Sequence, residues 1–337
     1  ELGMGAISRR IRALYNKANW YSSLAISHLR AKLPNVRKRW KGDRFSTPAK
    51  KHAVFVHFDT EGVIHDYVIK YLDDLRDCGF EITFVTNSPE MPDDSVALLK
   101  PLCRLIVHRY NSGYDFAAYR DGIRQIPDLD QCEALILAND SVYGPLFSLK
   151  DELAGLDPET LDVWGITDSW EFNYHVQSYF MLFFPRALRS KAFKKFWKRF
   201  PNLNNKHFVI KRGEIRLAQR LARDKLRIKV QCPYWEVAAD HVTPLRSFLS
   251  AKTVDKFSPL QVRWLQDMED KIVLGIPLNP SHSFWERVIR ERGCLFLKRE
   301  LIQKNPLSIP FVWRWKDVVD ECTDYDSDLI SRHLHSL

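Results

Sequence analysis

Two polar clusters, each directly after a short apolar run, contain the residue types in this chain that are best suited to chemistry. The first follows the apolar run 105–107 and contains Arg109, Asn111, Gly113 and Asp115. The second follows the run 134–138 and consists of Asn139, Asp140 and Ser141. Carboxylate and amide oxygens suit Mg²⁺ or Mn²⁺, and such a cation can bridge the phosphates of a nucleotide diphosphate. The clusters therefore predict a nucleotide or sugar site with Asp140 as the candidate metal ligand.

The position of Asp140 alone leaves an alternative open, because an aspartate after a strand also commonly forms a turn or caps a helix. Common catalytic and phosphate-binding motifs are missing from the chain. The sequence has no G-x-x-x-x-G-K-[ST], G-x-G-x-x-G, G-x-S-x-G or H-E-x-x-H motif. This removes the commonest phosphate-loop, dinucleotide-binding, serine-hydrolase and zinc-protease interpretations.

The elements that must position these clusters alternate between strands and helices. Apolar runs predict strands at 53–58, 81–85, 105–107, 134–138, 163–166, 179–184 and 227–230. Helical patterns occupy 63–78, 95–100, 190–200 and 214–224. This order predicts right-handed crossovers and an α/β fold with a Rossmann-type, mostly parallel sheet flanked by helices. Ligands bind beyond the carboxyl ends of the strands in such sheets, which is where both clusters lie.

The order of these features resembles that of GT-A glycosyltransferases. Asn139-Asp140-Ser141 occupies the position of their metal-binding Asp-x-Asp motif, and Glu214 opens a helix as their acceptor-side acidic residue does. One position departs from the pattern, since Ser141 replaces the second aspartate. That difference weakens a metal site built on two carboxylates.

The chain also resembles a narrower group, the rhamnan synthesis F family of bacterial polysaccharide glycosyltransferases. Five motifs carry this resemblance, which spans about 50–306. They are Asn111-Ser112-Gly113-Tyr114-Asp115-Phe116 with Tyr119-Arg120; Asn139-Asp140-Ser141-Val142-Tyr143-Gly144-Pro145; Asp162-Val163-Trp164-Gly165-Ile166-Thr167; His175-Val176-Gln177-Ser178-Tyr179-Phe180; and Phe296-Leu297-Lys298 with Asn305-Pro306. The resemblance implies transfer of a sugar, often a deoxyhexose such as rhamnose, from a nucleotide-diphosphate donor. The implied acceptor is a growing, lipid-linked surface glycan such as O-antigen, capsule or rhamnan, with other glycosyltransferases as candidate partners.

Sugar transfer needs a neutralised diphosphate leaving group and a deprotonated acceptor hydroxyl. Asp140 with a divalent cation would serve the first need, and Arg109 or Arg120 would serve it without a metal. Glu214 is the expected base of an inverting displacement, and Asp168 is the competing base. A first-turn acidic residue that interacts with the helix dipole is an equally good interpretation of Glu214.

The remaining candidate residues are assigned to the donor or to the acceptor. The donor set comprises Asp59, Arg109, Asn111, Gly113, Asp115, Arg120, Asn139, Asp140 and Ser141. For Asp115, capping of the helix that begins near Phe116 is an equally good interpretation. The acceptor or sugar set comprises Tyr143, His175, Gln177 and Ser178. A buried structural network is the alternative for this second set.

The distribution of charge limits the partners of the chain. The 337 residues carry a net charge of +9, yet residues 1–50 hold 12 Lys and Arg against 2 Asp and Glu, which leaves −1 for the rest. We therefore expect no nucleic-acid partner for the body of the protein. The expected organisation is a basic segment and linker at 1–48, a nucleotide-sugar-binding core at 49–232, and a mostly helical region at 233–337 that completes the acceptor side.

The N-terminal segment has the pattern of a basic amphipathic helix. Its apolar residues recur at helical spacing: Ile7, Ile11, Leu14, Ala18, Tyr21 and Ala25. We expect residues 1–45 to contact an anionic membrane surface, although a helix docked on the body fits the same pattern. The six cysteines are scattered, which suits a reducing compartment, and the sequence shows no signal peptide. It also has no apolar run long enough to span a membrane. We therefore expect the chain on the cytoplasmic face of the bacterial plasma membrane. A catalytically silent nucleotide- or glycan-binding partner in a polysaccharide synthesis complex is the alternative function.

Overall fold

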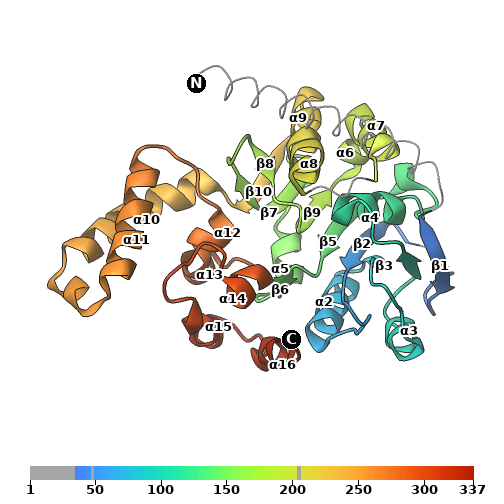
Figure 1. Cartoon of the computed structure of the whole chain (residues 1–337). Coiled ribbons are helices and arrows are strands. Elements are labelled where there is room, and N and C mark those ends of the chain that lie inside the picture. The colour runs from blue at the N-terminus through green and yellow to red at the C-terminus, as the bar shows by residue number, and fades with distance from the viewer. Residues whose placement is uncertain (1–34, 47–48, 203–205) are drawn as a thin grey trace, which may run out of the picture.

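The computed structural model describes residues 35–46, 49–202 and 206–337, and it is drawn in Figure 1. The predicted amphipathic helix and its membrane contact lie outside these residues. Most of the described strands form one sheet in the order β1-β4-β3-β2-β5-β9-β7-β10, with β8 attached to β7. Their bounds are β1 (Val36–Lys41), β2 (Lys51–His57), β3 (Glu81–Thr86), β4 (Leu105–Arg109), β5 (Ala134–Asn139), β7 (Val163–Ser169), β8 (His175–Val176), β9 (Phe180–Phe183) and β10 (Ile228–Cys232).

The sheet is mixed but mostly parallel, as the sequence predicted. Strand β2 pairs in parallel with β3 on one side and with β5 on the other. The antiparallel pairs involve β9, which lies between β5 and β7, and the edge strands β1 and β8. The strand order reverses between β2 and β5, so the carboxyl ends of these two strands border the crevice where α/β proteins bind ligands.

Helices cover both faces of the sheet (Figure 1). Along β2, Ala53 and Phe55 belong to one buried cluster, while Val54 and Val56 belong to the other, as the two-residue period of a strand requires. The bounds are α2 (Asp66–Asp77), α3 (Asp93–Leu99), α4 (Tyr114–Ile123), η1 (Leu129–Gln131), α5 (Leu149–Ala154), α6 (Pro185–Arg189), α7 (Lys191–Arg199), α8 (Lys206–Val209), η2 (Ile210–Glu214) and α9 (Ile215–Arg223). Helices α2 and α3 cover the first face, and α4, α7 and α9 cover the second.

The C-terminal region is mostly helical, as predicted, and includes an arm formed by α10 and α11 that projects from the body (Figure 1). Its bounds are α10 (Tyr234–Ser250), η3 (Lys252–Lys256), α11 (Pro259–Val273), α12 (Pro280–Ser283), α13 (Trp285–Arg292), β11 (Leu297–Lys298), α14 (Arg299–Lys304), η4 (Val312–Arg314), α15 (Trp315–Cys322) and α16 (Asp328–His335). Among the described helices, none combines the length and apolar character needed to cross a bilayer.

Strand β1 corrects one expectation, since its residues had been assigned to the basic segment and linker. It pairs antiparallel with β4, and Trp40 stacks on His108 with ring centroids 6.4 Å apart. Its lysines and arginines are mostly exposed because an edge strand has few neighbours, and such charges protect an edge from pairing with another chain. The apolar pattern that marks central strands is therefore missing from it.

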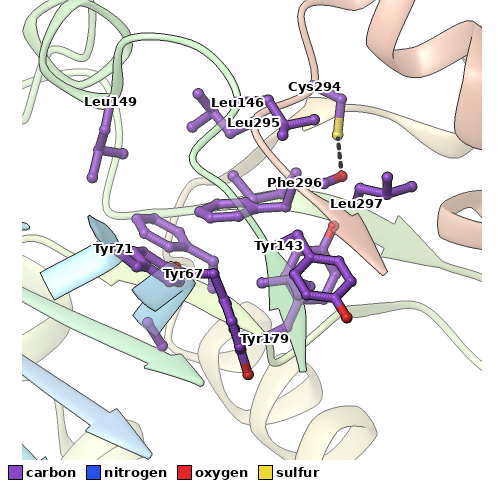
Figure 2. Packing of buried hydrophobic residues seen from close by; sticks show 14 of the residues in the cluster. Tyr67, Tyr71, Tyr143, Leu146, Leu149, Tyr179, Cys294, Leu295, Phe296 and Leu297 are labelled. Atoms are coloured by element: carbon purple, nitrogen blue, oxygen red, sulfur yellow. Dashed lines mark hydrogen bonds between the residues drawn. The ribbon is translucent and has the colours of Figure 1, made fainter. Parts of the chain in front are cut away.

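A short two-stranded pairing attaches the C-terminal region to the end of β5. Strand β6 (Val142–Tyr143) pairs antiparallel with β11, and Arg299 N donates to Ser141 O at 3.1 Å. Figure 2 shows Phe296 among the aromatic residues of the core, and its ring lies 5.1 Å from that of Tyr71. Gly144 allows the close approach, because a Cβ there would lie 2.4 Å from Leu295 O. The pairing fixes the backbone next to Asp140.

Candidate functional site

Asp140 follows β5 at the point where the strand order reverses. Its carboxylate accepts hydrogen bonds from Phe58 N at 3.3 Å and from Arg299 Nη1 at 2.9 Å. Arg299 is the first residue of α14, and its Nη1 also donates to the Tyr67 hydroxyl at 2.6 Å and to Asp140 O at 2.7 Å. The Asp140 side chain is 11% exposed and that of Arg299 is 18% exposed, so the ion pair is largely shielded from water. A guanidinium group thus lies next to the predicted metal ligand.

A second cation comes from the same C-terminal segment. Lys298 Nζ donates to Ser141 Oγ at 3.3 Å and lies 4.1 Å from the centre of the Tyr179 ring. The Ser141 hydroxyl donates in turn to Asn139 Oδ1 at 2.6 Å. The position that carries the second aspartate in GT-A enzymes is therefore associated with a lysine in this chain.

Asn139 joins the second polar cluster to the first. Its amide Nδ2 donates to Asp115 Oδ2 at 2.9 Å, which connects the end of β5 to the first turn of α4. Burial raises the pKa of Asp115 to about 6, with a further increase from Asp140 and opposition from Lys298. The two clusters that were predicted separately are thus in direct contact.

This pKa predicts how the variant Asp115→Asn behaves with pH. The folded carboxyl keeps its proton up to about pH 6, whereas the unfolded one releases it near pH 4, so the native chain loses stability as the pH rises between these values. Asparagine carries no charge at either pH, so the variant should gain stability relative to the native chain as the pH rises. Between pH 4.5 and pH 7.5 we expect its unfolding temperature, relative to that of the native chain, to rise by roughly 2 °C. This corresponds to about 1 kcal/mol of unfolding free energy for a half-buried side chain. Thermal unfolding at both pH values measures the difference, and an offset that is the same at both would contradict the prediction.

Glu214 lies at the end of the π-helical turn η2, and its carboxylate is held from one side. Ser178 donates to Glu214 Oε1 through its backbone N at 3.1 Å and through its hydroxyl at 2.6 Å. The other oxygen, Oε2, is 3.6 Å from His175 Nε2, and the Glu214 side chain is 16% exposed. The adjacent Gly213 packs against Phe116, where an added Cβ would lie 3.0 Å from the ring. Ser178 therefore positions one carboxylate oxygen of Glu214, and the second faces His175.

The Glu214 group and the Asp140 group belong to one site. Asn139 N donates to Tyr179 O at 3.2 Å, and the Tyr119 hydroxyl donates to Ser178 O at 2.9 Å. The charge of Glu214 also contributes to the raised pKa of Asp115. The structure thus gathers Asp115, Asn139, Asp140, Ser141, His175, Ser178 and Glu214 at one edge of the sheet.

The donor set at Asp140 suits a divalent cation poorly. Mg²⁺ and Mn²⁺ favour several anionic or neutral oxygens, but Asp140 Oδ2 is already paired with Arg299 and Ser141 is close to Lys298. Within the described residues, no group of three or more His, Cys, Asp or Glu side chains has the arrangement of a metal site. The divalent cation at Asp140 stays a prediction.

Arg109 and Arg120, the alternative phosphate ligands, are buried and bonded to Asp121. Arg109 donates to Asp121 Oδ2 at 3.1 Å and to Asn87 Oδ1 at 2.6 Å. Arg120 donates to Asp121 Oδ1 at 2.7 Å and to Phe200 O at 2.5 Å. The side chains of the two arginines are 0% and 2% exposed. Among the described residues, neither arginine forms a hydrogen bond with Asp140, Ser141 or Arg299.

Three predicted donor residues lie in loops beside the crevice. Asp59 follows β2, and its Oδ1 accepts from Glu61 N and Val63 N at 2.9 Å each, so this oxygen stabilises a turn. Gly113 has a φ of +82° at the start of α4, and Asn111 is exposed in the preceding loop. Their contact with a donor stays a prediction.

Three further candidates connect elements to one another. The Tyr143 hydroxyl is 2.8 Å from His333 Nδ1, inside the contact with α16. Thr167 Oγ1 donates to Gln177 Oε1 at 2.6 Å. Asp168 Oδ1 accepts from Tyr234 N at 2.6 Å, which places this carboxylate at the first turn of α10, and burial raises its pKa. Among the described residues, neither Gln177 nor Asp168 shares a hydrogen bond with Asp140, Ser141 or Arg299, whereas the Tyr143 hydroxyl also interacts with Arg299.

Lys298 and Arg299 are the site residues that the sequence interpretation did not assign. Lys298 stood within the motif Phe296-Leu297-Lys298, which carried part of the family resemblance without a chemical role. Both residues meet Asp140 and Ser141 only through the pairing of β11 with β6. Their distance along the chain from Asp140 explains why spacing gave no signal.

The chain is similar to a known family and to individual proteins. A profile described as rhamnan synthesis protein F matches residues 82–337. The virulence protein VirA of Vibrio anguillarum is 24% identical over 296 residues, which are 85% of this chain and 91% of VirA.

Two solved glycosyltransferase structures show a distant likeness. The glycosyltransferase GlyE of Streptococcus pneumoniae is 8% identical, with a TM-score of 0.34 over 69% of this chain, which spans 65% of the length of GlyE. The mannosyltransferase PcManGT of Pyrobaculum calidifontis, solved with GDP-Man and Mn²⁺, is 10% identical, with a TM-score of 0.35 over 96% of this chain and 90% of its own. The family match covers most of the chain, and the motifs between Asn111 and Asn305 lie within it. The chain therefore belongs to the rhamnan synthesis protein F family, and it is an enzyme of the glycosyltransferase class that its motifs implied.

Proposed function

We propose that this enzyme transfers a sugar from a nucleotide-diphosphate donor to a hydroxyl of a growing surface polysaccharide, with inversion at the anomeric carbon. The observation that carries the proposal is the pairing of Asp140 with Arg299 beside Lys298, in a region where Glu214 and Asp140 both raise the pKa of Asp115. Cations at one end of a site and a positioned carboxylate at the other match the charges that develop during such a transfer. The family name supports rhamnose as the sugar and a rhamnan, O-antigen or capsule chain as the product.

The proposed chemistry begins with the donor diphosphate at the end of β5. As the bond between the anomeric carbon and the diphosphate oxygen breaks, negative charge grows on the leaving group. Arg299 and Lys298 stabilise that charge, and Asp140 holds the guanidinium group of Arg299 in place. Arginine suits this task because its planar group can donate two parallel hydrogen bonds to a phosphate.

Glu214 accepts the proton from the acceptor hydroxyl in this proposal. The hydroxyl oxygen then forms the new bond to the anomeric carbon on the face opposite the diphosphate. Ser178 supports this role because both of its hydrogen bonds go to Oε1, so Oε2 accepts no hydrogen bond from Ser178 and lies 3.6 Å from His175 Nε2. Asp168 is the weaker candidate base because its carboxylate accepts from the first residue of α10.

The C-terminal region is part of this catalytic unit in the proposal. Residues 49–232 supply Asp140 and Glu214, while residues 233–337 supply Lys298 and Arg299. The region was expected to complete the acceptor side, and its hydrogen bonds to Asp140 and Ser141 support an additional role on the donor side.

Transfer assays with a panel of nucleotide sugars test the proposal, with and without a chelator. We expect Arg299→Ala to lower kcat by roughly 100- to 1,000-fold, the effect of removing one group that stabilises developing charge. Lys304→Ala, a change at an exposed cation at the other end of α14, is the matched control and should retain activity within about twofold.

The outcomes of these assays separate the alternatives. Transfer that survives the chelator and fails in Arg299→Ala supports cationic side chains at the diphosphate. Transfer that requires added Mn²⁺ and survives Arg299→Ala would reject that role and favour a metal at Asp140. Nucleotide-diphosphate binding without turnover of any sugar would favour the catalytically silent partner.

A further inference from the structure

Basic residues are concentrated in one segment of the body, although the net charge of the body as a whole is close to zero. Between residues 185 and 229 the sequence has 16 Lys and Arg against 2 Asp and Glu, a net charge of +14. The rest of the chain from residue 51 onward must therefore be strongly acidic, since the whole of 51–337 has a net charge of −1. The near-neutral body predicted from the sequence thus includes one strongly basic segment, from α6 to β10.

Helix α7 presents part of this charge as an exposed row. Ala192, Phe193, Phe196 and Trp197 are buried against the body, while the remaining α7 residues, Lys191, Lys194, Lys195, Lys198 and Arg199, are exposed. Helix α9 packs beside α7 (Figure 1). The two helices therefore form one basic face.

A groove of about 700 Å³ runs along α9 and the turn η2. Its lining includes Arg216, Arg220 and Arg223, which share one face of the helix because they are spaced four and three residues apart. None of these three forms an ion pair with an acidic side chain in the described part of the chain. Burial and the positive charges of Arg216, Arg199 and Arg223 lower the pKa of Arg220. An anion in the groove would relieve this repulsion.

One exposed aromatic side chain lines the same groove, and two more are exposed in neighbouring segments. Phe172 lines it and is 79% exposed, with a φ of +68° in the turn between β7 and β8. Trp170 and Trp235 are also partly exposed, with ring centroids 6.1 Å apart. Exposed aromatic residues beside arginine and lysine are typical of surfaces that lie in the headgroup region of a bilayer.

We propose that the face formed by α7, α9 and the Phe172 turn docks on a membrane containing anionic phospholipids, with lipid phosphates in the Arg216–Arg223 groove. Basic clusters near an anionic leaflet attract it electrostatically, and an exposed phenylalanine can enter the headgroup boundary. Nucleic acid is a less suitable occupant because its binding proteins stack successive bases on several aromatic side chains, whereas Phe172 is the single aromatic residue among the described residues that line the groove. This surface is built from residues other than 1–45, the segment for which a membrane contact was expected.

The docking face adjoins the acceptor side of the proposed active site. Ile210, Lys211 and Arg212 line the groove, and Glu214 ends the same turn. Asn173 also lines the groove, and its carbonyl is 2.8 Å from His175 Nδ1. If the proposed function holds, membrane docking presents this side of the enzyme to a lipid-linked acceptor.

Vesicle flotation of the full chain tests the docking face. The vesicles contain phosphatidylcholine alone or mixed with phosphatidylglycerol. We expect the triple variant Arg216→Gln/Arg220→Gln/Arg223→Gln to bind the mixed vesicles roughly 100-fold more weakly, since each basic residue near an anionic surface contributes about fivefold. The substitution Phe172→Ser should weaken binding by about tenfold without changing the charge.

The matched control removes the same charge from the projecting arm. Lys252→Gln/Lys256→Gln/Arg263→Gln alters exposed residues of η3 and α11, and its vesicle binding should stay within about twofold of native. Unchanged far-UV circular dichroism and native transfer to a water-soluble acceptor show that the groove variant is folded and that its defect is independent of the proposed chemistry.

Three results would overturn the docking proposal. The groove variant and Phe172→Ser could both bind mixed vesicles like the native chain, which would assign membrane binding to residues outside this face. The control could lose as much affinity as the groove variant, which would show that vesicle binding depends on the total charge of the chain and not on the position of the arginines. A chain that ignores vesicles and binds nucleic acid through the same arginines would assign the groove to a different partner.

Discussion

The variant Glu214→Gln is expected to lower kcat for sugar transfer by roughly 1,000-fold, within the range for loss of a general base. Glutamine keeps the size of the side chain and can still accept the two hydrogen bonds from Ser178. It cannot take a proton from the acceptor hydroxyl at neutral pH. We therefore expect KM for the donor to change little, because the donor diphosphate lies at the Asp140 end of the site in the proposal. Steady-state assays with both substrates varied measure this separation.

The variant Asp168→Asn is the control for Glu214→Gln, since it removes the competing base. We expect near-native kcat with a modest loss of stability, because Asp168 accepts a hydrogen bond from Tyr234 N at the start of α10. The reverse pattern, with Asp168→Asn inactive and Glu214→Gln active, would transfer the role of base to Asp168. Ser178→Ala adds a second check, because it should lower kcat while Glu214 itself stays intact.

The variant Asp121→Ala is expected to lower the free energy of unfolding by about 3–5 kcal/mol, the range for removal of one partner from a buried ion pair. Asp121 accepts from both Arg109 and Arg120, whose side chains are almost entirely shielded from water. Without the carboxylate, two guanidinium groups remain buried with only neutral acceptors such as Asn87 and the Phe200 carbonyl. Urea unfolding followed by circular dichroism measures the change.

An exposed ion pair in the same protein provides the comparison for Asp121. Glu133 pairs with Lys50 at 2.8 Å, but the two side chains are 51% and 75% exposed. We expect Glu133→Ala to change the free energy of unfolding by less than about 1 kcal/mol, as is usual for surface pairs. A loss in Asp121→Ala no larger than that in Glu133→Ala would show that the buried arginines find other compensation.

The central strands were predictable because each is buried on both faces. Apolar runs located β2, β3, β4 and β5 to within two or three residues, and their order predicted the crevice beside Asp140. Strand β1 was missed because an edge strand keeps its charged side chains exposed, so its sequence resembles a linker. The short strands β6 and β11 were missed for a different reason, since two residues are too few to show any period.

Part of the candidate site was predictable from types and order along the chain. Asn139, Asp140 and Ser141 follow a strand whose position the sequence revealed, and the structure brings Asp115 into contact with them. Sequence could not separate an arginine that faces a ligand from one that neutralises a buried aspartate, as Arg109 and Arg120 do. It also could not pair Asp140 with Arg299, because that contact depends on tertiary packing around Phe296.

The pairing of β6 with β11 determines when, during synthesis of the chain, the residues near Asp140 come together. The ribosome releases the sheet with Asp140 and Glu214 before it has made Arg299, which lies 159 residues after Asp140. In the proposed mechanism, a nascent chain that has folded this far contains the proposed base, Glu214, without the proposed cations, Lys298 and Arg299. If those roles hold, sugar transfer has to wait until the Phe296 segment has packed into the core, so activity depends on completed synthesis of the C-terminal region.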